Sequence, residues 1–282
     1  MRNISPQFRS HLSSEVTTLA TCWKLTRKDS RIFAFTDHDQ NLFVEGIKYD
    51  SIAGFTPTNI ESNSNMAVDN LDLTGQFHEN KITQTDLLAG KYDFAEVEIF
   101  LVNYQSPHDG KLIQKRGILG GVTLNKNLFH AEVRGLTQFL SQTMCETYLP
   151  HCRANLGDNR CRFNLDQQGF MVQTYILQTI DQQNFLATNL NQPADWFTSG
   201  YVHWLTGANI GLQMEVKNFA AGGQVTLVLP MPFVIEPADQ FIIYAGCDKS
   251  SRTCIEKFNN IINFRGEPDL PGMDRLTSKS RN

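Results

Sequence analysis

The sequence lacks a strong bias toward charge of either sign. Its 25 Lys and Arg residues nearly balance 29 Asp and Glu residues, so the formal net charge is −4. Proteins that bind nucleic acid through its phosphates carry clustered positive charge. We therefore expect no sequence-specific nucleic-acid partner. Hydrophobic residues make up 41% and charged residues 19%, which is typical of a globular chain and excludes a disordered one.

Long hydrophobic runs are also missing. Residues 97–102 and 241–246 form two of the longest apolar stretches, which have the length of a β-strand and fall far short of the ~20 residues of a membrane-spanning helix. The first residues, MRNISPQF, lack the apolar stretch of a secretory signal peptide. We therefore expect no membrane partner and synthesis in the cytoplasm, where thiols stay reduced.

Common catalytic motifs are absent: the chain contains no G-x-S-x-G, H-E-x-x-H, P-loop or dinucleotide-binding pattern. The triplet Asp37-His38-Asp39 could bind a cation, but its hairpin-like setting favours a turn with side-chain hydrogen bonds. A peptidase that pairs His151 with Cys145 or Cys152 is disfavoured, because adjacent residues seldom present nucleophile and base to each other.

What the sequence does contain is the period-2 alternation of β-strands, in short segments separated by Gly, Asn, Asp and Pro. In residues 94–102, for example, the alternation places Val97, Ile99 and Leu101 on one face. Residues 71–77 mostly alternate in the same way, and residues 224–229 and 240–244 are expected to form more deeply buried strands. The pattern predicts a mainly β fold with a few short helices: an N-terminal β-barrel or sandwich domain and a smaller C-terminal domain centred on cysteines.

Two helices are predicted by 3.6-residue spacing. Residues 82–90 fit one or two turns that end at Gly90, and residues 136–144 fit a helix of about ten residues that stops before Pro150. The expected inward face of the second helix consists of Leu136, Phe139, Leu140 and Met144.

A third helix is predicted near the C-terminus. Thr253 and Glu256 fit a capping box, which would start the helix at Thr253 and place Cys254 in its first turn, pointing inward. Phe258, Ile261 and Ile262 would share that inward face.

The predicted domains are residues 1–148 for the N-terminal β domain and 149–272 for the cysteine domain, followed by a flexible tail at 273–282. Residues 167–195 are rich in Gln and Asn and are expected to form surface hairpins or a domain junction.

Four of the six cysteines stand in two motifs within polar, turn-forming sequence. The first motif is Cys152-x₈-Cys161 and the second is Cys247-x₆-Cys254. Cys22 follows an apolar pattern beside Trp23 and is expected to be a core thiol, and Cys145 is a weaker candidate ligand.

Three interpretations of the paired cysteines compete. Buried packing thiols favour apolar neighbours, which these lack, and disulfides need an oxidising compartment. Ligation of a metal or cluster is favoured. Because structural zinc sites usually show tighter C-x₂₋₄-C pairs, the wider spacing favours an iron–sulfur cluster, with zinc as the alternative.

Basic residues surround these motifs and could favour thiolates, as could a helix N-terminus near Cys254. They are Arg153, Arg160, Arg162, Lys249 and Arg252. Equally, these side chains could be solvated or paired with Asp158 and Asp248.

The two cysteine motifs resemble a known family. Residues 152–161, CRANLGDNRC, and residues 246–272, which begin GCDKSSRTCIEKFNN, are similar to the tail hub family of bacteriophages and gene transfer agents. The second stretch is also similar to the tail-tip protein L of lambda-like phages. Weaker similarity at residues 35–39, 53–55, 68–71, 86–93 and 201–207 extends the resemblance over nearly the whole chain.

The resemblance implies a structural protein of the virion tail, at the tail tip or baseplate, assembled in the bacterial cytoplasm. Such a hub would form a ring, commonly a trimer, between a distal tail protein and the central fibre or spike proteins. It would hold an iron–sulfur cluster, expected to be 4Fe–4S, as a structural clip. The implied ligands are Cys152, Cys161, Cys247 and Cys254, and Cys22 and Cys145 fall outside the matched motifs.

A different class of function uses the same cysteines: a tail-associated cell-wall hydrolase or thiol/redox enzyme. An enzyme of that kind needs one accessible thiol with a low pKa, whereas a structural clip needs four equivalent buried sulfurs.

Overall fold

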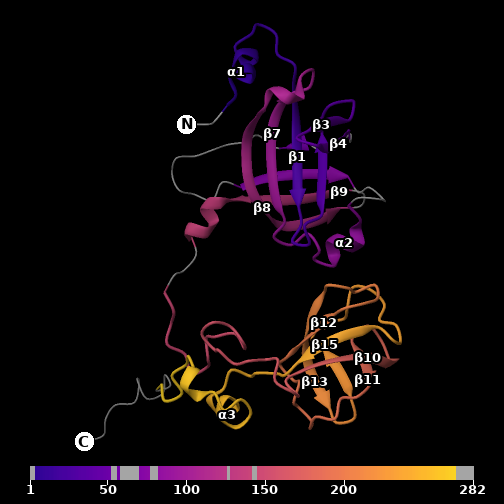
Figure 1. Ribbon diagram of the computed structural model, residues 1–282, viewed down its shortest axis with the longest axis vertical. Coiled ribbons are helices and arrows are strands. Elements are labelled where there is room, and N and C mark those ends of the chain that lie inside the picture. Colours follow the sequence, from indigo (N-terminus) through magenta and orange to yellow (C-terminus); the bar gives the residue numbers. More distant parts are fainter. Residues whose placement is uncertain are drawn as a thin grey trace, which may run out of the picture. The chain divides into compact units, whose positions relative to one another are not determined.

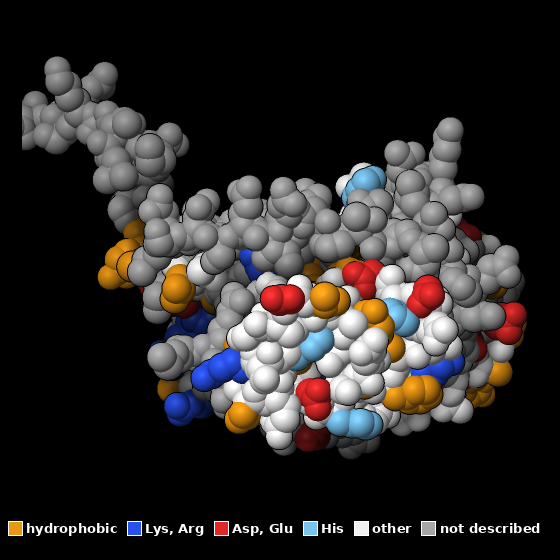
Figure 2. All heavy atoms as spheres, turned by 90° about the horizontal axis from the view of Figure 1, so that it is seen from above, with side chains coloured by type: hydrophobic (Ala, Val, Ile, Leu, Met, Phe, Trp, Pro, Cys, Tyr) orange, Lys and Arg blue, Asp and Glu red, His pale blue; other side chains and the backbone are white. Residues whose placement is uncertain are grey.

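The computed structural model in Figure 1 describes residues 4–51, 56–57, 70–76, 82–125, 128–141 and 145–270. The chain divides into two compact units, Met1–Met144 (unit 1) and Cys145–Asn282 (unit 2). Within the described ranges, every helix is too short or too polar to span a membrane. The tail predicted at 273–282 lies outside the described residues. On the face drawn in Figure 2, acidic, basic and histidine side chains are interspersed with hydrophobic ones.

Unit 1 is built on a sheet in which nine described strands follow the order β3-β4-β2-β1-β7-β8-β9-β6-β5. The strands are β1 (Leu19–Thr26), β2 (Ile32–Thr36), β3 (Leu42–Val44), β4 (Ile47–Ser51), β5 (Thr56–Pro57), β6 (Asn70–Gln76), β7 (Glu96–Asn103), β8 (Lys111–Asn125) and β9 (Leu128–Gly135). Most pairs are antiparallel, and β2 pairs with β4 in parallel. A one-turn helix, η1 (Pro107–Asp109), precedes β8.

Strand β7 is packed on both faces. Val97 and Ile99 lie in one apolar cluster with Trp23, and Phe100 and Val102 lie in another. The predicted face therefore holds for Val97 and Ile99 but not for Leu101, which is only half-buried. A register shift against β8 falls between Ile99 and Phe100, as expected for a β-bulge that re-aims side chains.

Two short α-helices flank this sheet. Helix α1 (Pro6–Leu12) starts at the N-cap Ser5, whose hydroxyl accepts the amide N–H of Phe8, and the Phe8 ring is fully buried. Helix α2 (Gln84–Leu88) lies within the helix predicted at 82–90, and Gly90 follows it with φ +69°. That prediction is confirmed, although the helix is shorter than expected.

The helix predicted at 136–144 is wrong in type, and its last residues, 142–144, with Met144 of the predicted face, lie outside the described residues. Residues Leu136–Ser141 form a 3₁₀-helix, η2, and residues 145–150 are not helical. Phe139 and Leu140, expected on the inward face, are 54% and 75% exposed. A short amphipathic helix depends on burying its apolar face, and without that burial the longer α-helix has little to stabilise it.

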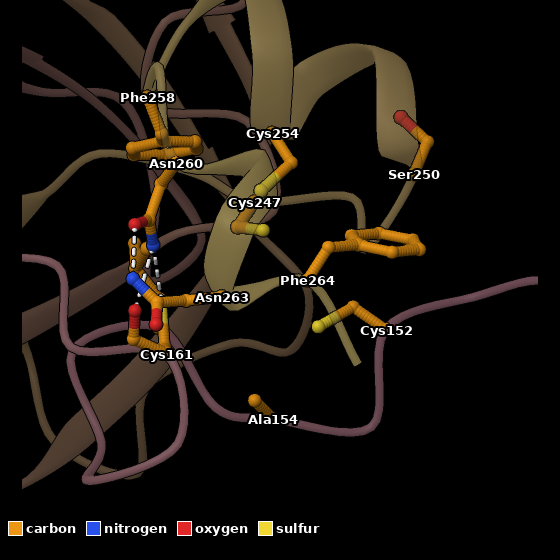
Figure 3. A pocket seen from close by; sticks show the side chains of 11 residues that line it. Cys152, Ala154, Cys161, Cys247, Ser250, Cys254, Phe258, Asn260, Asn263 and Phe264 are labelled. Atoms are coloured by element: carbon orange, nitrogen blue, oxygen red, sulfur yellow. Dashed lines mark hydrogen bonds between the residues drawn. The ribbon is translucent and has the colours of Figure 1, made fainter. Parts of the chain in front are cut away.

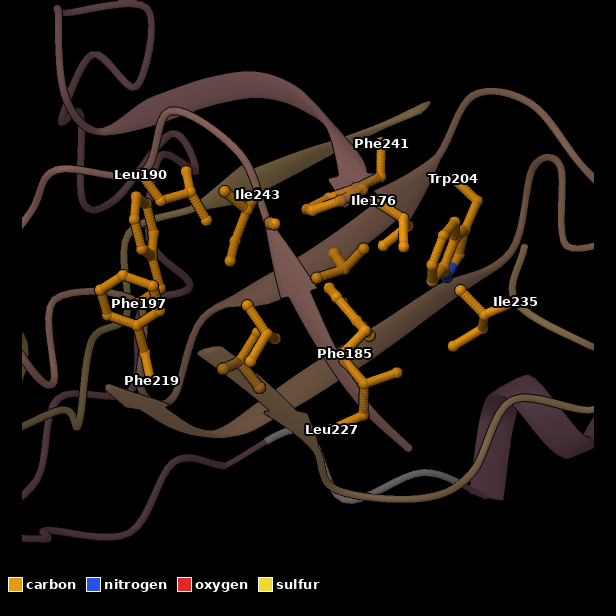
Figure 4. Packing of buried hydrophobic residues seen from close by; sticks show 14 of the residues in the cluster. Ile176, Phe185, Leu190, Phe197, Trp204, Phe219, Leu227, Ile235, Phe241 and Ile243 are labelled. Carbon is orange, nitrogen blue, oxygen red and sulfur yellow. The ribbon is translucent and has the colours of Figure 1, made fainter. Parts of the chain in front are cut away.

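Unit 2 contains a closed β-barrel with the order β10-β11-β14-β13-β12-β15. Its strands are β10 (Met171–Thr179), β11 (Asn184–Ala187), β12 (Tyr201–Trp204), β13 (Gln213–Ala220), β14 (Gln224–Leu227) and β15 (Gln240–Tyr244). Aromatic and aliphatic side chains fill the barrel, among them Phe185, Trp204 and Phe241, as Figure 4 shows. The predicted mainly β fold class is confirmed.

The Gln- and Asn-rich stretch at 167–195 forms a hairpin, as predicted. Strands β10 and β11 are joined by a turn in which the Asp181 carboxylate accepts the amide N–H groups of Gln183 and Asn184, both at 2.7 Å. This hairpin belongs to the barrel wall. After β15, the chain leaves the barrel and enters the second cysteine motif, which begins at Cys247 and ends within helix α3 (Ser251–Glu256); η3 (Ile261–Asn263) follows.

Candidate functional site

The structure brings the four paired cysteines to one cavity in unit 2. The cavity has about 330 Å³ of empty volume, and Cys152 and Cys161 line it together with Cys247 and Cys254. The sulfurs of Cys152, Cys247 and Cys254 point toward a common space in Figure 3, and Cys161 lies beside Asn260 and Asn263. The other lining residues are Ala154, Leu156, Ser250, Phe258 and Phe264. All six cysteines of the chain carry free thiols.

The first cysteine loop is shaped by one carboxylate. Asp158 accepts the backbone N–H groups of Asn155 at 2.8 Å, Arg160 at 2.9 Å and Cys161 at 2.7 Å. These hydrogen bonds, that of Cys161 foremost, lower the pKa of Asp158. The preceding Gly157 has φ +82°, which L side chains rarely adopt. The carboxylate and the glycine together fix the turn that carries Cys161.

The second cysteine motif begins where the chain passes very close to the barrel. A Cβ on Gly246 would lie 1.6 Å from the carbonyl oxygen of Thr198, so no other residue fits there without moving the backbone. The Gly246 amide donates to the carbonyl of Trp196 at 3.0 Å, and the Cys247 amide donates to that of Ser199 at 3.3 Å. Cys247 is thereby fixed to the end of the barrel.

Helix α3 has its N-cap three residues earlier than predicted. Its N-cap is Ser250, whose hydroxyl accepts the amide N–H of Thr253 at 3.1 Å and donates to Asp248 at 2.8 Å. Thr253 is therefore inside the helix. Ser250, held by Asp248, caps the helix instead of Thr253 because its hydroxyl accepts a free backbone N–H group one turn earlier in the chain.

The same helix also ends sooner than predicted. Asn259 has φ +45°, and the Asn260 amide donates to the carbonyl of Cys254 at 2.9 Å, an arrangement typical of a helix C-terminus. Cys254 lines the cavity and Phe258 is buried, in line with the predicted inward face. Ile261 and Ile262 do not share it: they are 43% and 91% exposed.

Each of the four sulfurs faces an N–H donor. The backbone amide of Arg265 lies 3.4 Å from Cys152 Sγ, and the side-chain amide of Asn260 lies 3.5 Å from Cys161 Sγ. Hydrogen bonding by the backbone N–H group of Lys249 acts to lower the pKa of the Cys247 thiol, and that of Asn260 acts to lower the pKa of the Cys254 thiol. Donors aimed at sulfur stabilise the thiolate, which is the form that binds metals.

Burial opposes ionisation of these thiols when they are considered by themselves. Burial, together with charge repulsion from the neighbouring cysteines Cys152, Cys247 and Cys161, raises the pKa of Cys254 to about 11. Burial also raises the pKa of Cys247. Four thiolates in one cavity repel one another, and a bound cation would neutralise that repulsion while the N–H groups stabilise the sulfurs. The residues thus fit a thiolate-bound metal or cluster.

The described residues contain no group of three or more His, Cys, Asp and Glu side chains arranged to hold a single metal ion. The four cysteines line one common cavity.

The basic residues near the motifs bind carboxylates and carbonyls. Arg153 forms a two-pronged ion pair with Glu267 at 2.6 and 2.9 Å and also contacts Glu146, which binds Arg160 as well. Arg252 pairs with Glu256 at 3.0 Å within α3. Pairing therefore holds for Arg153, Arg160 and Arg252. Arg160 lies 3.9 Å from the predicted partner Asp158, but the closer partners in the first loop are Glu146 and Glu267.

Backbone hydrogen bonds hold the two cysteine motifs and the C-terminal segment together. The Cys152 amide donates to the carbonyl of Lys249 at 2.8 Å, and the Lys249 ammonium donates to the carbonyl of Ala154 at 2.6 Å. Leu149 and Glu267 are joined in both directions, through the Glu267 amide and the Glu267 carboxylate. The site is thus a junction of three chain segments.

An aromatic cluster connects this junction to the barrel. The Phe163 ring lies 4.9 Å from the rings of both Phe170 and Phe258, and Phe170 lies 5.3 Å from Trp196. Lys257 packs over the Trp196 ring and donates to the carbonyls of Trp196 and Gly246. Burial lowers the pKa of Lys257 to about 8.

Sequence reasoning did not assign roles to Lys257, Trp196 or Asn260. The signal for two of them was present, because Lys257 and Asn260 lie in the Lys-Phe-x-Asn part of the family-like motif. Trp196 stands outside the motifs, and only the fold brings it to the site.

The remaining candidates lie elsewhere. Cys22 is fully buried with its sulfur 3.7 Å from the hydroxyl of Thr36, and burial raises its pKa to about 11, so the predicted core thiol is confirmed. Cys145 is exposed and does not line the cavity, nor does any histidine, including the exposed His151. Asp37 lies in the expected turn, where its carboxylate accepts the Thr21 amide at 2.7 Å.

Comparisons with known proteins agree on one family. The family described as "Baseplate hub protein, N-terminal attachment domain" matches residues 5–164, and the family described as "Phage conserved hypothetical protein BR0599" matches residues 195–274. A chain in the solved structure "Virion of native gene transfer agent (GTA) particle" is 36% identical with a TM-score of 0.88, over 97% of this chain and 95% of that one. Among curated proteins, no match was found. The chain therefore belongs to the baseplate hub protein family, whose members are structural components of phage-like virion tails.

Proposed function

We propose that this chain is a tail-tip hub in which Cys152, Cys161, Cys247 and Cys254 hold an iron–sulfur cluster as a structural clip. The observation that carries the proposal is the convergence of two distant cysteine motifs on one cavity, with an N–H donor at each sulfur. Iron–sulfur clusters in proteins are held by four thiolates, and hydrogen bonds to the sulfurs are a usual part of such sites.

The spacing of the thiols supports a cluster over a single zinc ion. Zinc draws four sulfurs to about 2.3 Å from one centre. The C-x₈-C and C-x₆-C spacings of this chain are wider than the C-x₂₋₄-C pairs that are usual in structural zinc sites. The four thiolates of a 4Fe–4S cluster bind different iron atoms and surround a larger volume.

The clip would act on the segments that the hydrogen bonds already bring together. Cys152 and Cys161 belong to the loop that enters unit 2, and Cys247 and Cys254 belong to the segment that leaves the barrel. Closing such a long loop costs conformational entropy, and metal binding to the folded state contributes to folding free energy. Bound iron would supply the positive charge that the four thiolates need.

The test is an anaerobic purification of the full chain, followed by an absorption spectrum between about 300 and 500 nm, where iron–sulfur proteins absorb. Iron, zinc and acid-labile sulfide are assayed in parallel. The informative variant is Cys247→Ser, and the matched control is Cys145→Ser, because Cys145 is exposed and away from the cavity.

A brown protein with iron and sulfide, unchanged in Cys145→Ser and colourless in Cys247→Ser, would support the proposal. If the assay finds one zinc per chain and no iron, the bound group is zinc instead of a cluster, and the structural role of the four cysteines is kept. A chain without metal in which the four thiols remain free would overturn the clip.

We also propose that hub chains associate into a ring, with a trimer as the expected copy number, between a distal tail protein and the central fibre or spike proteins. Support comes from the family and from the similarity to a chain of a gene transfer agent virion. Native mass spectrometry of the purified chain, alone and with co-expressed tail proteins, tests this assembly. A chain that stays monomeric in both preparations would contradict it.

A further inference from the structure

A groove lies directly beside the cysteine cavity in unit 2. It has about 1250 Å³ of empty volume, against about 330 Å³ for the cysteine cavity. One wall comes from the cysteine loops and the other from the barrel. The wall residues used below are Leu156 and Cys247 on the first side and Tyr201, Val228 and Leu229 on the second.

Two residues, Leu156 and Cys247, line both spaces. Leu156 is half-buried, and it stands in the loop between Cys152 and Cys161. Of the four cysteines, Cys247 alone reaches the groove; Cys152, Cys161 and Cys254 line the inner cavity only.

The wall formed by the barrel is held by a ring-stacking contact and has apolar side chains at its edge. Tyr201 stacks on Tyr244 with ring centroids 4.3 Å apart, which fixes the barrel side. Val228 and Leu229 are 41% and 60% exposed at the edge. The Lys249 ammonium, which could otherwise extend into the groove, is bound to the carbonyl of Ala154.

We propose that this groove is the entrance to the cysteine site, that Leu156 separates the two spaces, and that Cys247 is the thiol that incoming solutes meet first. The identity of the solutes, ferrous iron and sulfide, rests on the proposed function. The route itself concerns the four thiols and can be measured without any metal.

The experiment measures the rate at which N-ethylmaleimide modifies each cysteine of the full chain, prepared anaerobically in a chelator and analysed by peptide mass spectrometry. The variant Val228→Trp narrows the groove from the barrel side without touching the inner cavity. We expect it to slow modification of Cys247 at least about fivefold, because alkylation depends on access to the sulfur. Exposed Cys145 provides the internal reference rate.

Two further variants make the result specific. Ile210→Trp adds the same bulk at a position that is 61% exposed and outside the groove, and should leave all rates unchanged. Leu156→Ala opens the passage and should speed modification of Cys254, which lines the inner cavity but not the groove, at least about threefold. Circular dichroism checks that every variant is folded.

The proposal is overturned if Val228→Trp leaves the Cys247 rate unchanged or slows exposed Cys145 to the same extent. A second measurement, the rate of iron release from the anaerobically purified chain to an external chelator, distinguishes failure of the proposed route from failure of the proposed cluster. If the chain holds iron and Val228→Trp changes neither rate, the route fails while the proposed function stands. If no iron is found but Cys247 still reacts through the groove, the function fails while the route stands.

Discussion

The side-chain amide of Asn260 donates to the carbonyl oxygen of Cys161 at 2.7 Å, and the same nitrogen lies 3.5 Å from the Cys161 sulfur. Asn263 orients this amide by donating to its oxygen at 2.8 Å. Asn260 also presents its backbone N–H to Cys254. One residue that follows the second motif therefore contacts both cysteine motifs.

Replacing Asn260 by Ala should loosen the first cysteine loop. The change removes a partly buried hydrogen bond to a carbonyl and a donor to sulfur, so we expect a loss of about 1–2 kcal/mol in unfolding free energy. Urea denaturation measures this loss. The exposed Asn159→Ala, in the same loop, is the control and should change stability by less than about 0.5 kcal/mol. Equal stability of the two variants would show that the Asn260 side chain does not hold the loop.

Replacing Glu267 by Gln should weaken the junction in a pH-dependent manner. Arg153 holds the pKa of the Glu267 carboxyl below its usual value, so the folded state favours the carboxylate. The stabilisation is therefore present above the ordinary carboxyl pKa and is lost as the pH falls through the lowered value. Thermal denaturation of both proteins from pH 7 to pH 3 should show a melting-temperature difference that shrinks with acid. A constant difference would contradict the ion pair as its cause.

A methyl group at Gly246 should be poorly tolerated. Its Cβ would meet the carbonyl oxygen of Thr198 and, at 2.8 Å, the amide nitrogen of Gly200, so the strand leading to Cys247 must shift. We expect Gly246→Ala to cost about 3 kcal/mol or more, at the upper end for overpacking. Gly121→Ala is the control, because its Cβ has open space and an ordinary φ. Similar urea midpoints for the two variants would refute the steric argument.

Lys257→Met should destabilise unit 2 while keeping most of the apolar contact with Trp196. The substitution leaves the carbonyls of Trp196 and Gly246 without the ammonium donor that both now share. We expect a loss of about 2 kcal/mol in unfolding free energy, within the range for buried acceptors that lose a partner. Lys217→Met, at an exposed barrel position, should be close to neutral. A stable Lys257→Met protein would mean that water replaces the ammonium.

The strands and the paired cysteines could be predicted because their signals are local. Alternation in residues 240–244 reflects one face turned to the barrel core, and the polar loops around Cys152 and Cys247 mark turns. The helix ends could not be predicted as well. At α3, the sequence offers two caps, Ser250 and Thr253, and only the position of Asp248 decides between them.

The donors to the sulfurs were beyond sequence reasoning for a different reason. Arg265 and Asn260 reach Cys152 and Cys161 across long stretches of chain, and Lys249 presents its amide from a left-handed conformation with φ +64°. Such contacts depend on how three segments meet after folding, so the spacing of residues in the sequence does not predict them.

The two units also differ in how they can accept a neighbour. A closed barrel has every strand paired on both sides, so the wall of unit 2 leaves no strand edge as a template for another chain. In the described part of unit 1, by contrast, the sheet ends at β3 and β5. Among the described strands, any continuation of a sheet from one protein into the next within an assembled tail would therefore start from the edges of unit 1, while the barrel would meet its neighbours through side chains and loops.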